Sequence, residues 1–148
     1  MGLDMYLSAR KYVDKIDWSK LDRDSDAKYS EATFPQWNNV VEAAGLTDIV
    51  DKESVYGVSV SVNVAYWRKV NSVHAWFVRN VQQGNDDCGE YYVSHSKLKE
   101  LARDCTLAIT NKDSSLLPPQ EGFFFGGTDI DEWYWRDLMD TISQLQPL

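Results

Sequence analysis

Polar side chains that could hold a small ligand recur along one segment of the chain. Arg68, Asn71 and His74 are spaced three residues apart, and a helix places residues with that spacing on one ridge. An arginine can pair with a phosphate, and a histidine can act as a general base or a hydrogen-bonding partner near neutral pH. The ring of Trp67 could stack on a base. This pattern is typical of a binder or enzyme for a nucleotide or another small polar ligand.

Two acids and a cysteine follow this segment at Asp86, Asp87 and Cys88. If the fold brings them to the ridge, the candidate ligand-binding set is Trp67, Arg68, Asn71, His74, Asp87 and Cys88. A purely structural interpretation competes with this one. A lone histidine on a helix is usually satisfied by a backbone carbonyl at the edge of the core, and paired acids after a helix usually belong to a turn.

Metal and covalent chemistry find little support in the sequence. Cys88 and Cys105 form no CxxC pair, and the two histidines are His74 and His95. A structural zinc site needs four closely placed ligands, which these residues supply only if the fold gathers them. The chain also lacks a GxxxxGK[ST] phosphate loop. The sequence therefore predicts no metal and no cofactor, assigns no catalytic residue, and favours binding over enzymatic activity.

A second candidate surface lies near the C-terminus, where acids and tryptophans alternate. The candidate partner-binding set is Asp129, Asp131, Glu132, Trp133 and Trp135. Acids suit the positive end of a helix, and tryptophan often anchors protein interfaces. The expected inner stripe of this helix is Ile130, Tyr134, Leu138, Thr141 and Leu145. That stripe leaves both tryptophans facing outward; the alternative is a solvated acidic face whose tryptophans are covered by neighbours.

Hydrophobic periodicity predicts the elements that must position these residues. Alternation with a period of two predicts strands at residues 3–13 and 55–66. A short strand is expected at 90–94, and the apolar run bracketed by glycines at 122–127 predicts a buried strand or a tight backbone approach. Spacings of three and four predict helices at 34–44, at 66–82, from a cap at Ser96 to Cys105, and at 129–145. The polar stretch 14–33 predicts a long surface loop. The expected fold is α+β: one domain over residues 1–148, with one sheet of about four strands and three to four helices.

Composition excludes several classes of protein. The chain has 148 residues, a formal charge of −8 and 43% hydrophobic residues, so it is neither a disordered chain nor a typical binder of duplex nucleic acid. No segment reaches the length of apolar residues that a membrane span needs. Two cysteines make no disulfide framework, which favours a cytoplasmic setting. The acid excess lies after residue 30, because residues 31–148 hold 17 acids and nine bases.

Three segments of the chain carry a family resemblance. They are the opening MGLDMY, the pattern YWRK-x-N-x-x-H-x-WFV that begins at Tyr66, and the GFFFG segment that begins at Gly122. In these segments the chain resembles a group of small proteins encoded by bacteriophages and by bacteria that carry prophages. The resemblance implies a phage-type origin and a single domain, and it carries over no activity, cofactor or catalytic residue.

The leading hypothesis is a small acidic phage-type accessory protein that acts by binding. Its partner would be a host protein or an anti-phage defence protein in the cytoplasm of the host cell. One alternative is a binder or enzyme for a nucleotide or another small polar ligand, at the ridge that carries His74. Another is a structural or oligomeric phage component, and the sequence leaves self-association open.

Overall fold

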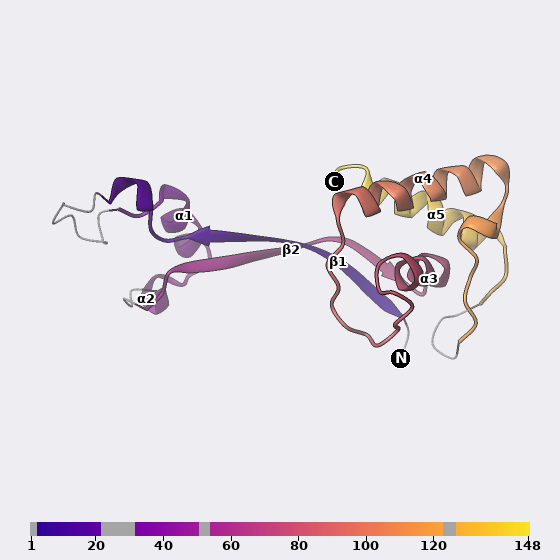
Figure 1. The fold of residues 1–148 in the computed structure, drawn as a ribbon, viewed down its shortest axis with the longest axis horizontal. Helices are drawn as coiled ribbons and strands as arrows, with labels where there is room; N and C mark the ends of the chain where they lie inside the picture. The colour runs from indigo at the N-terminus through magenta and orange to yellow at the C-terminus, as the bar shows by residue number, and fades with distance from the viewer. Residues whose placement is uncertain (1–2, 22–31, 51–53, 123–126) are drawn as a thin grey trace. The chain divides into compact units, whose positions relative to one another are not determined.

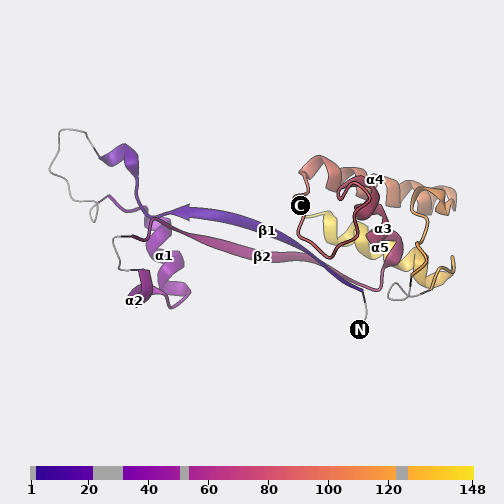
Figure 2. The same cartoon turned by 60° about the horizontal axis from the view of Figure 1, so that its bottom comes forward.

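The computed structural model describes residues 3–21, 32–50, 54–122 and 127–148. Their elements, shown in Figure 1, are β1 (Asp4–Asp14), η1 (Trp18–Lys20), α1 (Pro35–Ala43), α2 (Thr47–Val50), β2 (Gly57–Arg68), α3 (Asn71–Asn80), α4 (His95–Asn111), η3 (Ser114–Leu116) and α5 (Glu132–Leu145). β1 and β2 lie side by side as a two-stranded antiparallel sheet (Figure 2). With five helices beside this sheet, the chain is α+β, as its sequence predicts.

The chain divides into two compact units, each with its own apolar core. Unit 1 comprises Met1–Leu7 and Asn63–Leu148, and unit 2 comprises Ser8–Val62. β1 begins in unit 1 and ends in unit 2, and β2 returns the chain to unit 1. One domain over residues 1–148 stays a prediction.

Helices α3, α4 and α5 provide most of the core of unit 1. α3 is buried from Asn71 to Val78, and α4 and α5 contact each other along their apolar stripes. The largest fully buried side chains are Trp76, Leu101, Leu117, Leu138, Val73, Thr141 and Cys105. Dense packing of this kind holds each helix in one rotation about its axis, because side chains in a core interdigitate with few voids.

The inner stripe of α5 largely follows the sequence prediction. Tyr134, Leu138, Thr141 and Leu145 are all buried. Ile130 is a correction, since it is 42% exposed. The reason is that α5 begins at Glu132, after a cap in which the Asp131 carboxylate accepts the backbone N–H of Tyr134 at 3.0 Å.

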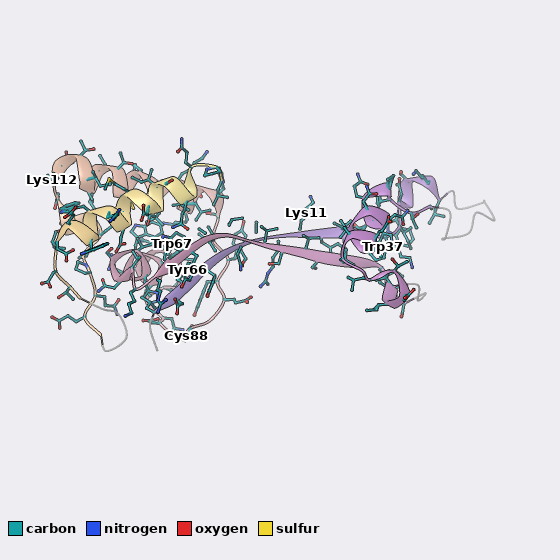
Figure 3. All side chains as sticks on the ribbon, turned by 180° about the vertical axis from the view of Figure 1, so that it is seen from behind. Lys11, Trp37, Tyr66, Trp67, Cys88 and Lys112 are labelled. Atoms are coloured by element: carbon teal, nitrogen blue, oxygen red, sulfur yellow. The ribbon has the colours of Figure 1, made fainter. Side chains whose placement is uncertain are left out.

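One buried hydrogen bond joins β2 to α5. The Trp67 ring N–H donates to the Thr141 hydroxyl oxygen at 2.9 Å, and that hydroxyl donates to the Asp137 carbonyl at 2.8 Å. Trp67 also packs against Phe77, with ring centroids 5.8 Å apart. Figure 3 labels Trp67 and Tyr66 near the end of β2. The strand is thereby attached to the middle of the last helix.

Unit 2 has a small core around Trp37, Val41 and Val50. α1 follows its sequence signals closely: Pro35 opens it, where no backbone N–H is needed, and the chain leaves it through Gly45 at φ +65°. The ring of Tyr12 lies over Gly57, where any Cβ would collide with the phenol. A larger residue at the start of β2 would have to displace the exposed Tyr12 side chain.

Two predicted helix starts are wrong. The helix expected from residue 66 begins at Asn71, because the strand alternation continues to Arg68 with Ala65 and Trp67 buried. Lys69, at φ 59°, then turns the chain towards α3. The cap of α4 is Ser94 rather than Ser96, and its side chain accepts the backbone N–H of Lys97.

The sheet of the described residues has two strands rather than about four. Residues 90–94 form no strand, because no neighbouring strand pairs with them, and most of the expected strand at 122–127 falls outside the described residues. The predicted surface loop at 14–33 is also described only in part. Within it, Ile16 forms an antiparallel bridge with Thr33, and both Ile16 and Ala32 are buried.

None of the helices described for this chain is both long and apolar enough to span a bilayer.

The Trp67–Thr141 bond makes a prediction for stability. Thr141→Val keeps the side-chain shape but leaves the buried indole N–H of Trp67 without its acceptor, so the free energy of unfolding should fall by about 1–3 kcal/mol. Thr106→Val is the matched control, because Thr106 is exposed and its hydroxyl bonds only the Ala102 carbonyl one turn earlier. It should change the free energy by less than about 0.5 kcal/mol in urea titration. Equal losses for the two variants would contradict the role of this bond.

Candidate functional site

Two predicted ligand residues, Trp67 near the end of β2 and Asn71 at the start of α3, make contacts within the fold. Trp67 is buried with its ring N–H bound, so its faces pack against protein and leave little surface for stacking a base. The side chain of Asn71 donates to the Gly127 carbonyl at 2.9 Å and accepts the backbone N–H of Gln120 at 3.1 Å. Asn71 therefore holds together the two chain segments on either side of residues 121–126.

His74 has a carboxylate partner that the candidate set omits. Its Nε2 lies 3.1 Å from Asp86 Oδ1, with the histidine side chain almost fully buried and the aspartate partly exposed. The expected backbone-carbonyl partner is thus replaced at this nitrogen by an acid from the turn after α3. The sequence signal for it was the pair of acids that follows the helix, but spacing alone could not tell Asp86 from Asp87.

The remaining three predicted ligand residues are exposed. Arg68 ends β2, and Cys88 sits in a turn at φ 59°. Asp87 accepts the Gly89 backbone N–H and the Tyr91 hydroxyl, both at 2.9 Å. These two hydrogen bonds, the first foremost, hold the pKa of Asp87 below its ordinary value. Asp87 therefore matches the turn interpretation of the paired acids.

A small acidic cavity of about 150 Å³ lies where α3 and α5 begin. Residues from both helix starts and from the segments before them line it: Lys69, Asn71, Ser72, Pro119, Gly127, Asp129, Asp131, Trp133, Tyr134 and Asp137. It includes three carboxylates and a single lysine, so its local charge is negative. Asn71 belongs to both this cavity and the predicted ligand set, whereas Trp67, Arg68, His74, Asp87 and Cys88 are not part of its lining.

Asp137 is the most perturbed acid of this cavity. Burial, followed by repulsion from Asp140 and Asp131, raises its pKa to about 6. Its place one helical turn after Trp133 could have been recognised from the sequence, because residues four apart are neighbours on a helix. Lys69, Ser72 and Pro119 carried no such signal, since only the fold brings them to α5.

The two tryptophans of the predicted partner surface differ in burial. Trp133 is 65% exposed, and the guanidinium of Arg136 lies 5.5 Å from its ring centroid. Trp135 is only partly exposed and packs against the core of unit 1. Its ring lies edge-on to that of Tyr134, with the ring centroids 4.8 Å apart. The Lys112 ammonium covers the Trp135 ring, 5.5 Å from the ring centroid. Figure 3 labels this lysine just after α4. The outward orientation expected for Trp135 is therefore wrong, because this side chain packs against the core of unit 1 next to Tyr134.

The carboxylates of the predicted surface have separate positions. Asp131 caps α5, Glu132 is its first residue, and Asp129 lies in the segment before it. All three suit the positive end of the helix dipole. Over the described ranges, no three His, Cys, Asp or Glu side chains come together closely enough to hold a metal ion.

Comparison of the chain with protein-family models, with curated proteins and with solved structures gives no match.

The raised pKa of Asp137 predicts a pH-dependent cost to folding. Between its ordinary pKa of 3.8 and the folded value of about 6, the folded protein keeps a proton that the unfolded chain releases. The free energy of unfolding therefore falls as pH rises through this window. Asp137→Asn should raise it by about 1 kcal/mol at neutral pH, allowing for solvent screening of a half-buried group. Below the window the variant should match the wild type.

Urea titrations at the two pH values measure this difference. Asp140→Asn is the control on the same helix, because it removes only part of the repulsion and should give a smaller gain at neutral pH. A destabilised Asp137→Asn protein at neutral pH would show that the carboxylate is needed for folding and would overturn this prediction.

Proposed function

We propose that this chain is an accessory protein that binds a protein partner through the Trp133 surface, defined as Asp129, Asp131, Glu132, Trp133 and Asp137. The observation that carries the proposal is the 65% exposure of Trp133 at the rim of a cavity lined by carboxylates. Tryptophan is enriched among the residues that dominate binding energy in protein interfaces. An exposed indole among acids offers a partner both apolar contact and charge.

The chemistry of the cavity favours a partner that presents lysine or arginine. Its three carboxylates outnumber its one lysine, so an incoming cation gains more attraction than repulsion. The ring of Trp133 already has a guanidinium at 5.5 Å, that of Arg136, which shows that this ring can take part in cation–π contact. A cavity of about 150 Å³ suits one side chain rather than a whole ligand.

The energetics of Asp137 support a binding role. Its raised pKa means that the ionised carboxylate costs folding energy at neutral pH. Proteins commonly retain such costs where a site serves function, since activity and stability trade against each other. A bound cation would reverse the cost, because an opposite charge lowers the pKa of a carboxyl.

The resemblance to phage and prophage proteins narrows the kind of partner. We infer a bacterial host or anti-phage defence protein, met in the cytoplasm of the host cell and bound without catalysis or a cofactor. The formal charge of −8 argues against duplex nucleic acid as the direct target, because such binding needs clustered basic side chains.

The test is to capture the partner from bacterial lysate with the tagged full chain, purify it, and measure Kd by calorimetry. Trp133→Ala should raise Kd at least about thirtyfold, which corresponds to a binding hot spot. Trp18→Ala is the matched control, because Trp18 is 60% exposed in unit 2 and belongs to a different surface. That variant should bind like the wild type.

A cationic partner also implies pH dependence. Affinity should increase as pH rises through about 6, where Asp137 loses its proton. Asp137→Asn should remove that dependence. If Trp133→Ala and Trp18→Ala bind equally well, or if binding strengthens as pH falls, the Trp133 surface is not the binding site.

A further inference from the structure

The part of β2 that belongs to unit 2 has an edge with no paired strand among the described residues. β1 is the one strand paired with β2 in the described part of the chain, so the other edge of β2 presents backbone N–H and C=O groups to solvent. An isolated two-stranded ribbon is only marginally stable in water, and an unpaired edge is a template for another strand. Near the end of β2 this edge is covered, because the Tyr66 backbone N–H donates to the Gln144 side chain at 2.8 Å.

The open part of β2 has no charge to protect it. The stretch Gly57–Trp67 contains no Asp, Glu, Lys or Arg, and it alternates valine with small polar residues up to Val64. Natural edge strands are normally protected from pairing by charged side chains, proline or bulges. The valine side of an alternating strand is normally buried, yet Val62 is 53% exposed. This part of β2 therefore has the properties of a strand that is covered by a partner.

We propose that the partner is a second copy of this chain, with β2 paired antiparallel to β2 around a two-fold axis. In a pairing centred on Val60, Val58 lies opposite Val62 and Ser59 opposite Ser61 of the other copy. Each of these contacts then occurs twice, as a symmetric interface requires, and valine meets valine while serine meets serine. Two chains of charge −8 repel each other, so an uncharged strand is where contact costs least.

The pairing also limits the assembly to two copies of the chain. The resulting sheet has the order β1–β2–β2–β1, so both of its outer strands are β1. β1 carries Arg10, Lys11 and Asp14, all exposed, and Figure 3 labels Lys11 on this strand. Charges of this kind discourage further strand addition. The structure thus points to a dimer rather than to an open fibre.

Sedimentation velocity of the full chain over a range of concentrations tests the proposal. The wild type should move from the mass of one chain to that of two and stop there. Val62→Lys should weaken the dimer about tenfold or more, because it brings two new positive charges to the paired edge. Ser61→Lys, also at an exposed position, should act in the same way and gives a second reading if the first variant does not fold.

Ala9→Lys is the matched control. It adds the same charge at an exposed position of the other strand, β1, and should leave the dimer intact. Circular dichroism confirms that each variant is folded. A wild type that stays monomeric, that grows beyond two chains, or that loses its dimer equally through Ala9→Lys and Val62→Lys would overturn the proposal.

Discussion

The attachment of β2 to α5 through Trp67 and Thr141 is the constraint on which unit 1 depends. The indole N–H must find an acceptor once it is buried, and the Thr141 hydroxyl supplies it at 2.9 Å. Because Thr141 and Leu138 are fully buried, this bond and the packing around it fix the rotation of α5. That rotation turns Trp133 out to solvent and brings Asp137 to the cavity at the start of α3.

The resulting surface combines two unfavourable features, an exposed indole and a crowded carboxylate. Apolar surface in water and a charge in a half-buried place both cost free energy, and the cationic partner that we propose would relieve both costs. Helix capping accounts for Asp131, but it accounts for neither Asp137 nor the exposure of Trp133. The proposed binding role would account for their proximity.

The sequence predicts elements well where local chemistry decides them. Pro35 and Gly45 mark the ends of α1, and the spacing of Tyr134, Leu138, Thr141 and Leu145 gives the buried face of α5. Prediction from the sequence fails where strand and helix periodicities overlap, or where a position is decided by contacts with residues distant in the chain. Tyr66, Val70 and Val73 have helical spacing, yet the strand continues past Tyr66 to Arg68, with Ala65 and Trp67 buried, and the helix begins only at Asn71.

The candidate site shows the same limit. The exposed position of Trp133 follows from the stripe of α5. The roles of Asn71 and His74 depend on Gly127, Gln120 and Asp86, which spacing alone does not identify as their partners. Trp135 is covered by Lys112, which approaches from the end of α4. These contacts join segments that are distant in the sequence and arise from packing, so the periodicity of a single sequence does not predict them.

Nuclear magnetic resonance of the six tryptophan indole N–H signals tests the binding role of the Trp133 surface most directly. The purified partner is added stepwise to the isotope-labelled chain, and Trp133→Phe and Trp18→Phe variants assign the two exposed indoles. The Trp133 signal should shift in proportion to the bound fraction while the Trp18 signal stays unchanged. A Trp133 signal that remains unchanged at saturation would contradict the proposed site.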